Sequence, residues 1–304
     1  MIIRRAFRRY IEPSLRAFAS YDLTQDPRII LMKIVDIDKD SLLNAMSDLG
    51  DEFLMLNQEI RQKYEMLNLD YPREFAIEQN SAFLIYSLIR LLKPDKVVET
   101  GVANGHSTFF ILNAILKNGK GKLYSIDIDY NVGILVDEQL KANWRLYVLP
   151  RANSRELNKY LSTIAPVDIF IHDSNHMYYW QIMEYRTFLR HINDYGLILS
   201  DYVDYSLAFI DFCNENELKP LFLYDHRKIF GVVKVAAHHR SLRTWRLPPP
   251  LAGPGLVDAC APGAAAAGGP VPAGSPGSSG HWPLLPPSGR GTRRSRGALS
   301  RVEF

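Results

Sequence analysis

The sequence has few cysteines and no long apolar run. Its 304 residues include only Cys213 and Cys260, which lack the spacing of a metal site and give no disulfide framework, so a reducing compartment is favoured. No stretch of about 18 apolar residues is present, so we expect no membrane-spanning helix. The N-terminus also lacks the apolar core and cleavage site of a secretory signal. We therefore expect a cytoplasmic protein, whose 47% of hydrophobic residues are enough for a sizeable core.

The net positive charge of the chain comes from its C-terminal segment. Residues 236–304 contain eight Arg, no Lys and two acidic residues, so residues 1–235 carry a net charge of −3 although the whole chain carries +3. A mildly acidic body is unlike the basic domains that bind nucleic acid, and we expect no such partner.

The same segment, 236–304, is rich in Ala, Gly, Pro and Ser. Such a composition buries too little apolar surface to fold, so we predict a disordered tail. It is either a flexible part of the protein or an artefact of translation or assembly. We place no functional residue in it.

Two features precede the central region. Residues 1–20 interleave five Arg with apolar residues, which fits a helix docked on its own domain or a basic helix lying on an acidic membrane surface. The spacing of apolar residues predicts a long helix over 40–67 and a second over 77–92. We interpret residues 1–74 as an N-terminal helical extension that covers the core or joins two copies in a homo-oligomer.

From Lys96 onward, short apolar runs alternate with amphipathic segments, as in a parallel sheet covered by helices on both faces. Strands are predicted at 96–100, 122–127, 145–149, 167–172 and 196–200, and helices at 107–117, 134–141, 154–163, 175–192 and 205–216. The extended segments 220–224 and 229–235 are joined by four residues, too few for a crossover, so they should pair antiparallel. We predict an α/β domain over 75–235 with a doubly wound, mostly parallel seven-stranded sheet that ends in this hairpin.

The first predicted strand, 96–100, runs into a turn of small residues. The residues of interest are the acid Glu99, then Gly101, Ala103 and Gly105, then Ser107, which can cap the next helix. A strand, a small-residue turn and a helix start bring a ligand close to bare backbone and to a helix N-terminus. The next strand ends in Asp127, where a carboxylate is suitably placed to accept hydrogen bonds from ribose hydroxyls.

The most selective segment is Asp173-Ser174-Asn175-His176-Met177-Tyr178, which follows strand 167–172. A carboxylate and an imidazole three residues apart across a turn can face one cleft. The next strand ends in Asp201, and two carboxylates at neighbouring strand ends can chelate a hard divalent cation. The alternative interpretations are helix capping for Asp173 and a plain surface position for His176.

Together these segments resemble the class I S-adenosylmethionine-dependent methyltransferases. The resemblance covers residues 75–235 and is to the family that includes cephalosporin- and macrolide-modifying O-methyltransferases and is related to catechol O-methyltransferase. It implies that the methionine part of the cofactor is lined by Glu99, Gly101, Ala103 and Gly105. It likewise implies that the ribose is bound by Asp127 and the adenine by Asn153 and Ser154, with Ser107 and Asp173 completing the cofactor-binding set.

The resemblance also implies catalytic roles. His176 is the candidate general base, with Asp173 beside it, and Asp173 and Asp201 are the candidate ligands of Mg²⁺. We expect O-methylation of a hydroxylated small molecule, such as a sugar or a polyketide- or phenol-like metabolite. His176 would take the hydroxyl proton, and a cation would lower the pKa of the hydroxyl.

Two other functions share part of this pattern. A nicotinamide-dependent oxidoreductase has a similar strand, turn and acid, but here the turn lacks the Gly-x-Gly-x-x-Gly pattern. A non-catalytic, cofactor-binding scaffold protein recruited through residues 1–20 is the second alternative.

Overall fold

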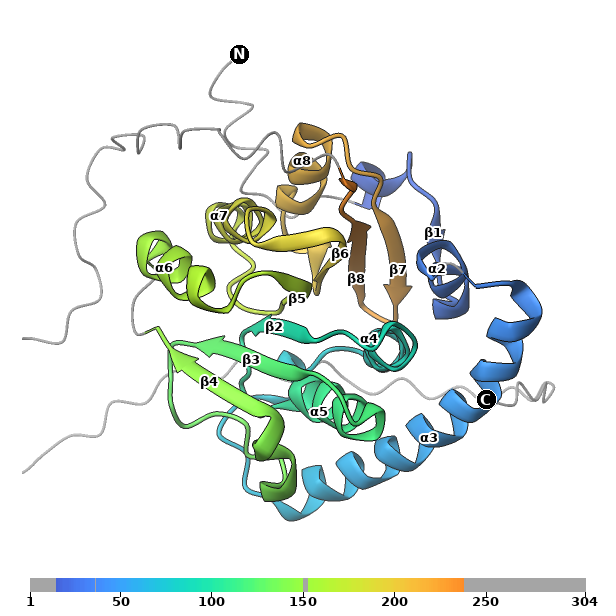
Figure 1. The fold of residues 1–304 in the computed structure, drawn as a ribbon, viewed down its shortest axis with the longest axis vertical. Helices are drawn as coiled ribbons and strands as arrows, with labels where there is room; N and C mark the ends of the chain where they lie inside the picture. The colour runs from blue at the N-terminus through green and yellow to red at the C-terminus, as the bar shows by residue number, and fades with distance from the viewer. Residues whose placement is uncertain (1–14, 36, 150–152, 238–304) are drawn as a thin grey trace, which may run out of the picture. The chain divides into compact units, whose positions relative to one another are not determined.

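The computed structural model describes residues 15–35, 37–149 and 153–237 (Figure 1). Its centre is an eight-stranded sheet in the order β1-β7-β8-β6-β5-β2-β3-β4. The strands are β1 (Leu23–Thr24), β2 (Lys96–Thr100), β3 (Lys122–Asp127), β4 (Trp144–Val148), β5 (Val167–His172), β6 (Ile192–Ser200), β7 (Leu221–Asp225) and β8 (Lys228–Lys234). The predicted strands are found within a few residues of their expected bounds.

Only β8 runs against its neighbours. It pairs antiparallel with β6 and with β7, whereas every other pairing in the described sheet is parallel. The predicted doubly wound, mostly parallel sheet with a terminal hairpin is confirmed. The sheet has one strand more than predicted, because the two residues of β1 are too short to show a periodic pattern in the sequence.

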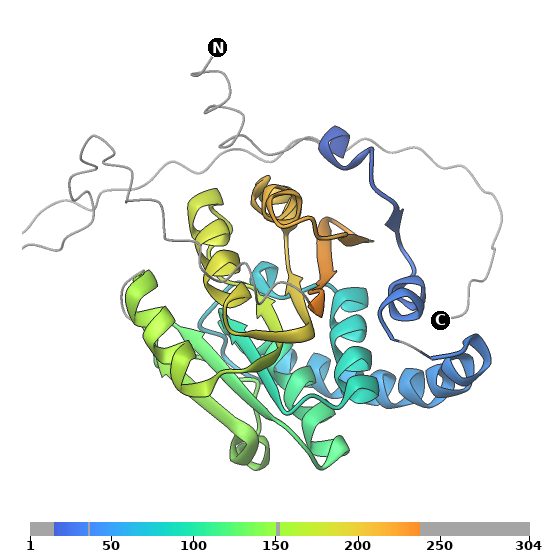
Figure 2. The same cartoon turned by 45° about the horizontal axis from the view of Figure 1, so that its top comes forward.

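Helices cover both faces of the sheet (Figures 1 and 2). On one face lie α2 (Pro27–Ile34), α3 (Lys39–Met66), α4 (Gln79–Leu92) and α5 (His106–Asn118), and on the other α6 (Ser154–Ile164), α7 (Tyr178–Leu189) and α8 (Ala208–Glu215). Because side chains alternate along a strand, Val97 packs with the first group and its neighbour Val98 with the second. The apolar strands are thus buried from both sides, as the sequence pattern indicates.

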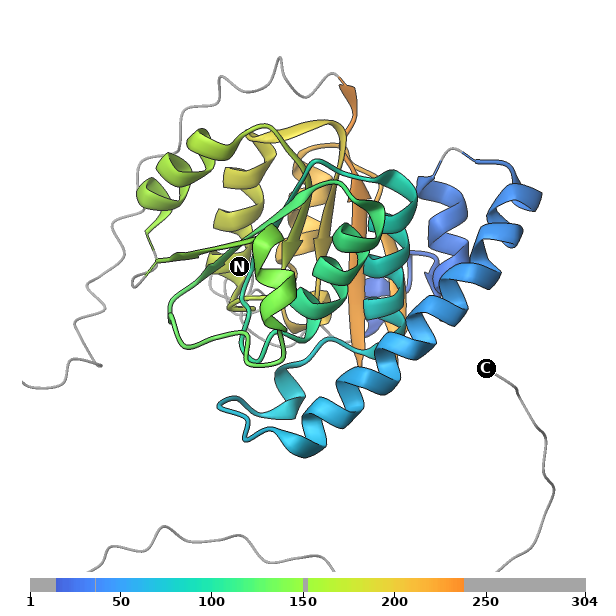
Figure 3. The same ribbon diagram turned by 60° about the horizontal axis from the view of Figure 1, so that its bottom comes forward.

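Helix α3 runs along the α4–α5 side of the molecule (Figure 3). Its Phe53 stacks on Phe110 of α5, with ring centroids 4.8 Å apart. Its Glu52 accepts a 2.7 Å hydrogen bond from the hydroxyl of Tyr86 on α4. The extension before residue 75 therefore shares the core of the sheet, and β1 adds to the sheet edge.

Several predicted boundaries shift. The expected helix over 134–141 is a short 3₁₀ helix, Glu138–Asn143, and α7 begins at Tyr178 because Asn175 accepts a hydrogen bond from the Met177 amide in the preceding loop. Helix α5 begins at His106, and its N-cap is Gly105 in the left-handed conformation. The expectation that Ser107 caps α5 is wrong, because its hydroxyl donates to the carboxylate of Glu99 instead.

Some predictions fall outside the described residues. These are the tail beyond residue 237 and the basic segment before residue 15. Within the described parts of the chain, no helix has the length and apolar character needed to cross a bilayer.

Candidate active site

A cavity of about 860 Å³ opens at the carboxyl ends of β2, β3 and β5. Parallel strands bring their carboxyl ends, and the loops that follow them, to one edge of the sheet, where ligands of open α/β folds bind. The predicted site residues that line the cavity are Gly101, Ala103, Ser107, Asp127, Asp173 and His176. Glu99, Gly105, Asn153, Ser154 and Asp201 are not part of its wall.

The glycines of the first turn allow close packing of neighbouring loops. Gly101 has a φ of +83°, and a Cβ there would lie 2.1 Å from the carbonyl oxygen of Asp173. Gly105 has a φ of +88°, and a Cβ there would lie 2.8 Å from the Cα of Gly133. The Asp173 amide also donates a 2.9 Å hydrogen bond to the carbonyl of Thr100. Gly101 therefore brings Asp173 against the turn, which joins the two predicted motifs in one site.

Glu99 lies beneath the turn and is fully buried. Its carboxylate accepts hydrogen bonds from Thr108 Oγ1 at 2.8 Å, from Ser125 Oγ at 2.9 Å and from the hydroxyl of Ser107. Burial raises the pKa of Glu99 to about 7, although the three hydroxyls oppose the shift. In this structure Glu99 supports the turn from below, and its expected contact with the cofactor stays a prediction.

Asp127 stands at the end of β3 on the cavity wall. Its Oδ2 accepts a 2.7 Å hydrogen bond from the Val102 amide, and its Oδ1 accepts one of 3.1 Å from the Asp129 amide. These bonds fix the carboxylate across the first turn. Each carboxylate oxygen has two acceptor positions, so capacity remains for a ligand hydroxyl.

A segment of the N-terminal extension is fastened to the same turn. The Tyr71 amide donates to Asn104 Oδ1 at 3.1 Å, and Asn104 Nδ2 donates to the Tyr71 carbonyl at 2.8 Å. The Tyr71 hydroxyl donates to Asp129 Oδ2 at 3.2 Å, and burial, followed by the charge of Asp129, raises the pKa of Tyr71 to about 12. Sequence reasoning missed this clasp, because its two halves lie 33 residues apart and neither forms a motif alone.

The predicted adenine contacts lie away from the cavity wall. Asn153 is the N-cap of α6, and its Oδ1 accepts hydrogen bonds from the amides of Arg155 at 3.0 Å and Glu156 at 3.2 Å. Ser154 is the exposed first residue of that helix. The capping role expected at this position is confirmed for Asn153, while the contact with adenine stays a prediction. Leu149, just after β4, does line the cavity.

Three predicted residues cluster at the far side, where Asp173 and His176 line the cavity and Asp201 lies behind its wall. Ligand atoms of Asp173, His176 and Asp201 all lie within 4.8 Å of one another. Asp201 is buried, and its Oδ1 has no hydrogen-bond partner within the described part of the chain. Burial raises the pKa of both carboxyls, and at Asp173 the neighbouring Asp201 raises it further.

A lysine that sequence reasoning missed is paired with Asp201. Lys228, the first residue of β8, donates from Nζ to Asp201 Oδ2 at 2.8 Å and to the Ala76 carbonyl at 3.2 Å. Burial works to lower the pKa of Lys228, but the attraction of Asp201 and Asp173 outweighs it and the pKa is raised. In the sequence, Lys228 is one of the four residues that join the two predicted hairpin strands. Nothing at that position predicts a buried charge.

His176 is surrounded by aromatic rings. Its ring centroid lies 5.5 Å from that of His172 and 5.4 Å from that of Tyr202. Burial, with smaller effects of His172 and Lys228, holds the pKa of His176 well below its ordinary value. Its Nδ1 is buried and has no partner among the residues described. The arrangement gives a neutral imidazole, which is the protonation state that a general base requires.

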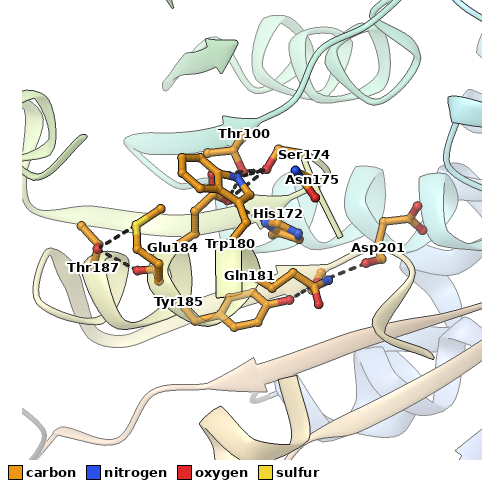
Figure 4. Close-up of polar contacts among 12 residues, drawn as sticks. Thr100, His172, Ser174, Asn175, Trp180, Gln181, Glu184, Tyr185, Thr187 and Asp201 are labelled. Carbon is orange, nitrogen blue, oxygen red and sulfur yellow. Dashed lines mark hydrogen bonds and ion pairs between the residues drawn. The ribbon is translucent and has the colours of Figure 1, made fainter. Parts of the chain in front are cut away.

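Beside His176, a polar network joins three elements (Figure 4). Glu184 of α7 accepts 2.7 Å from Thr100 Oγ1 at the end of β2, and its Oε2 lies 2.6 Å from His172 Nδ1 at the end of β5. Ser174 donates to the same carboxylate at 3.2 Å and accepts from Trp180 Nε1 at 3.0 Å. Glu184 is buried, so it fixes the loop that carries Asp173 and His176.

The chain has similarities to known proteins. Residues 98–203 match the family described as "Methyltransferase domain", and no curated protein matches the chain. Among solved structures, the O-methyltransferase TomG from Streptomyces achromogenes, in complex with SAM, is 13% identical, with a TM-score of 0.45 over 60% of this chain and 89% of that one.

Two further solved structures are similar to a comparable degree. A putative O-methyltransferase from Klebsiella pneumoniae is 16% identical, with a TM-score of 0.45 over 69% of this chain and 96% of its own. The SAH-bound methyltransferase PaMTH1 from Podospora anserina is 12% identical, with a TM-score of 0.44 over 66% and 97%. The family match spans β2 to the 3₁₀ helix after β6, which includes the strand ends that line the cavity.

Proposed function

We propose that this protein is an S-adenosylmethionine-dependent O-methyltransferase that acts on a hydroxyl group of a small molecule. The observation that carries the proposal is a single cavity that has Asp127 on one side and His176 on the other, within the segment that matches the methyltransferase family. The family match also favours this function over the nicotinamide-dependent alternative.

The turn side of the cavity supplies groups suited to the cofactor. Asp127 offers carboxylate acceptors for ribose hydroxyls, and the turn from Gly101 to Ser107 leads into the N-terminus of α5. When bound, S-adenosylmethionine supplies a methyl group on a sulfonium cation. We expect the sulfonium end to point from Asp127 toward His176, because the cavity extends between these two residues.

On the far side, His176 removes the proton of the acceptor hydroxyl. S-adenosylmethionine, if bound on the turn side, would supply the methyl group to this oxygen, and the proton stays on the imidazole of His176 until it passes to water. The neutral imidazole suits this role, and aromatic neighbours such as Tyr202 shield the reacting oxygen from water. The residues have only to hold the reactants in line and remove one proton.

The cytoplasmic location and the small-molecule substrate expected from the sequence are part of this proposal.

Calorimetric titration of the full chain with S-adenosylmethionine tests the proposal. We expect micromolar binding for the wild type and a loss of about tenfold or more in Asp127→Asn, since the neutral amide loses charge-assisted hydrogen bonds. Asp95→Asn is the matched control, because Asp95 is an exposed carboxylate at the opposite, amino end of β2. No binding by the folded wild type would overturn the proposal. Binding without transfer to a broad panel of hydroxylated acceptors would favour a non-catalytic scaffold.

A further inference from the structure

We propose that the ammonium group of Lys228 is the resident cation of this site, in place of a divalent metal, and that it binds the acceptor oxygen directly. This inference rests on the proposed function and names a further catalytic residue for it. The carboxylates predicted to hold Mg²⁺ would then position the lysine and the acceptor.

The fold holds Lys228 firmly in this position. It opens β8, which pairs with β6 on one side and with β7 on the other. Asp225, its partner in β7, accepts hydrogen bonds from the amide of Ser81 at 2.6 Å and from its hydroxyl at 3.0 Å, which ties the hairpin to α4. Lys228 is only 6% exposed and still lines the cavity. A buried lysine on a central hairpin is therefore a fixed part of the site.

The donor set does not suit Mg²⁺ while this lysine is present. Mg²⁺ requires near-octahedral oxygen ligands. Here one oxygen of Asp201 already accepts from the Lys228 ammonium at 2.8 Å, and the third donor is the imidazole of His176. A divalent ion at Asp201 would also sit next to a positive charge inside a buried site, where repulsion is weakly screened. A metal ion would have to compete with the Lys228 ammonium for the carboxylate of Asp201.

Lys228 has donor capacity left for a ligand. An ammonium has three N–H donors, and the hydrogen bonds to Asp201 and to the Ala76 carbonyl use two of them. Among the described residues, the other recorded neighbour of Nζ is the Tyr202 ring, whose centroid lies 5.4 Å away and is not an oxygen acceptor, so we assign the third N–H to an oxygen in the cavity. An acceptor hydroxyl held there accepts from Lys228 and donates its proton to His176. As the proton leaves, the negative charge on the oxygen develops beside a fixed positive charge, which stabilises the transition state. Lys228 keeps all its protons throughout.

Titration with Mn²⁺, followed by electron paramagnetic resonance of the free ion, tests the first half of the inference. We expect the full-length wild type to bind Mn²⁺ weakly, whereas Lys228→Met, which removes the ammonium and retains an unbranched side chain, should bind at least about tenfold more tightly. The gain should disappear in Lys228→Met combined with Asp201→Asn. Lys228→Arg is the matched control, since it keeps the charge and should show no gain.

Two results would overturn the inference. One is tight Mn²⁺ binding by the wild type that is lost in Asp201→Asn, and the other is a folded Lys228→Met variant with no gain in Mn²⁺ affinity. If Lys228→Met does not fold, the comparison of wild type with Asp201→Asn still decides. The same samples are titrated with S-adenosylmethionine, so that failure of the proposed function appears as lost cofactor binding, independently of the metal result.

Transfer rates test the second half. With an acceptor found in the panel, wild-type turnover should be unchanged by a chelator, and Lys228→Met should lower kcat by about tenfold or more while its affinity for S-adenosylmethionine stays the same. Lys228→Arg should restore part of the rate. Loss of wild-type activity on chelation, restored by Mg²⁺, would overturn the inference.

Discussion

The acids on the two sides of the cavity have different partners. On the turn side, Glu99 is held by three neutral hydroxyls and Asp127 by two backbone amides. On the far side, Asp173 and Asp201 face an ammonium and an imidazole, and buried polar atoms of His172, His176 and Asp201 have no partner among the described residues. Buried polar atoms without partners cost stability, so these three support our proposal that the chemistry takes place on the far side. The turn side is built to hold its shape.

The largest effect should come from His176→Ala, which removes the proposed general base on the far side of the cavity. Removing a general base typically costs about 10²- to 10⁴-fold in rate. We expect such a loss of turnover with unchanged affinity for S-adenosylmethionine, measured by transfer of a labelled methyl group and by calorimetry. The control is His226→Asn, because His226 is exposed in the hairpin turn and Asn tolerates its φ of +55°. Loss of cofactor binding in His176→Ala would contradict its assignment as the base.

Glu99→Gln should show the next largest effect, on stability. The pKa of Glu99 is raised from 4.5 to about 7, so its contribution to stability is fully present below pH 4.5 and is lost as the pH rises through 7. Between pH 4.5 and pH 8 the wild-type free energy of unfolding should fall by about 3 kcal/mol more than that of Glu99→Gln. Urea denaturation at both pH values measures this difference.

The matched control for this comparison is Glu215→Gln, because Glu215 forms an exposed ion pair with Arg186. Its pH dependence should follow that of the wild type. Identical pH dependence of the wild type and Glu99→Gln would show that burial does not perturb the pKa of Glu99.

Glu184→Gln should weaken the hydrogen-bond network beside His176 and leave the turn side unchanged. An amide has one oxygen to accept from Thr100, His172 and Ser174, so at least one donor is left unpaired. We expect the free energy of unfolding to fall by about 1–3 kcal/mol. As a positioning residue, Glu184 should also lower kcat, with cofactor affinity unchanged. A lower fraction of folded protein that accounts for all lost activity would leave Glu184 with a purely structural role.

The smallest effect should come from Tyr71→Phe on the turn side. This change removes the 3.2 Å hydrogen bond to Asp129 and keeps both backbone bonds of Tyr71 to Asn104. We expect the affinity for S-adenosylmethionine to fall by about fivefold or less, which corresponds to the loss of one hydrogen bond with a net contribution of about 1 kcal/mol. Calorimetry measures it, with Tyr195→Phe as the exposed control. A loss as large as that of Asp127→Asn would mean that the clasp itself forms the binding site.

The strands could be predicted because each carries its own signal. Val97 and Val98 open a buried strand after a Pro-Asp break, and Asp127 and Asp173 follow apolar runs, so the carboxyl edge of the sheet was identifiable from the sequence. The short strand β1 was not, since its two residues are positioned by pairing with β7 rather than by local pattern. Long-range pairing is invisible to periodicity.

The predicted site was incomplete where a charge is buried by distant partners. Glu184 lies within helix α7, and its burial is explained by its partners Thr100, His172 and Ser174. Lys228 lies at a hairpin turn, where charge is common, and Asp201 explains its burial. Both acquire their roles from residues that are far away in the chain, so single-sequence reasoning had no local pattern to use.

A crystal structure of the full chain with S-adenosylhomocysteine and Mg²⁺ tests the central claim most directly. The account predicts the ribose hydroxyls within hydrogen-bond distance of Asp127, the sulfur on the side of the cavity facing His176, and Lys228 still bound to Asp201 with no metal between them. A product bound away from Asp127, or with its sulfur turned away from His176, would contradict the claim that the two sides form one methyl-transfer site.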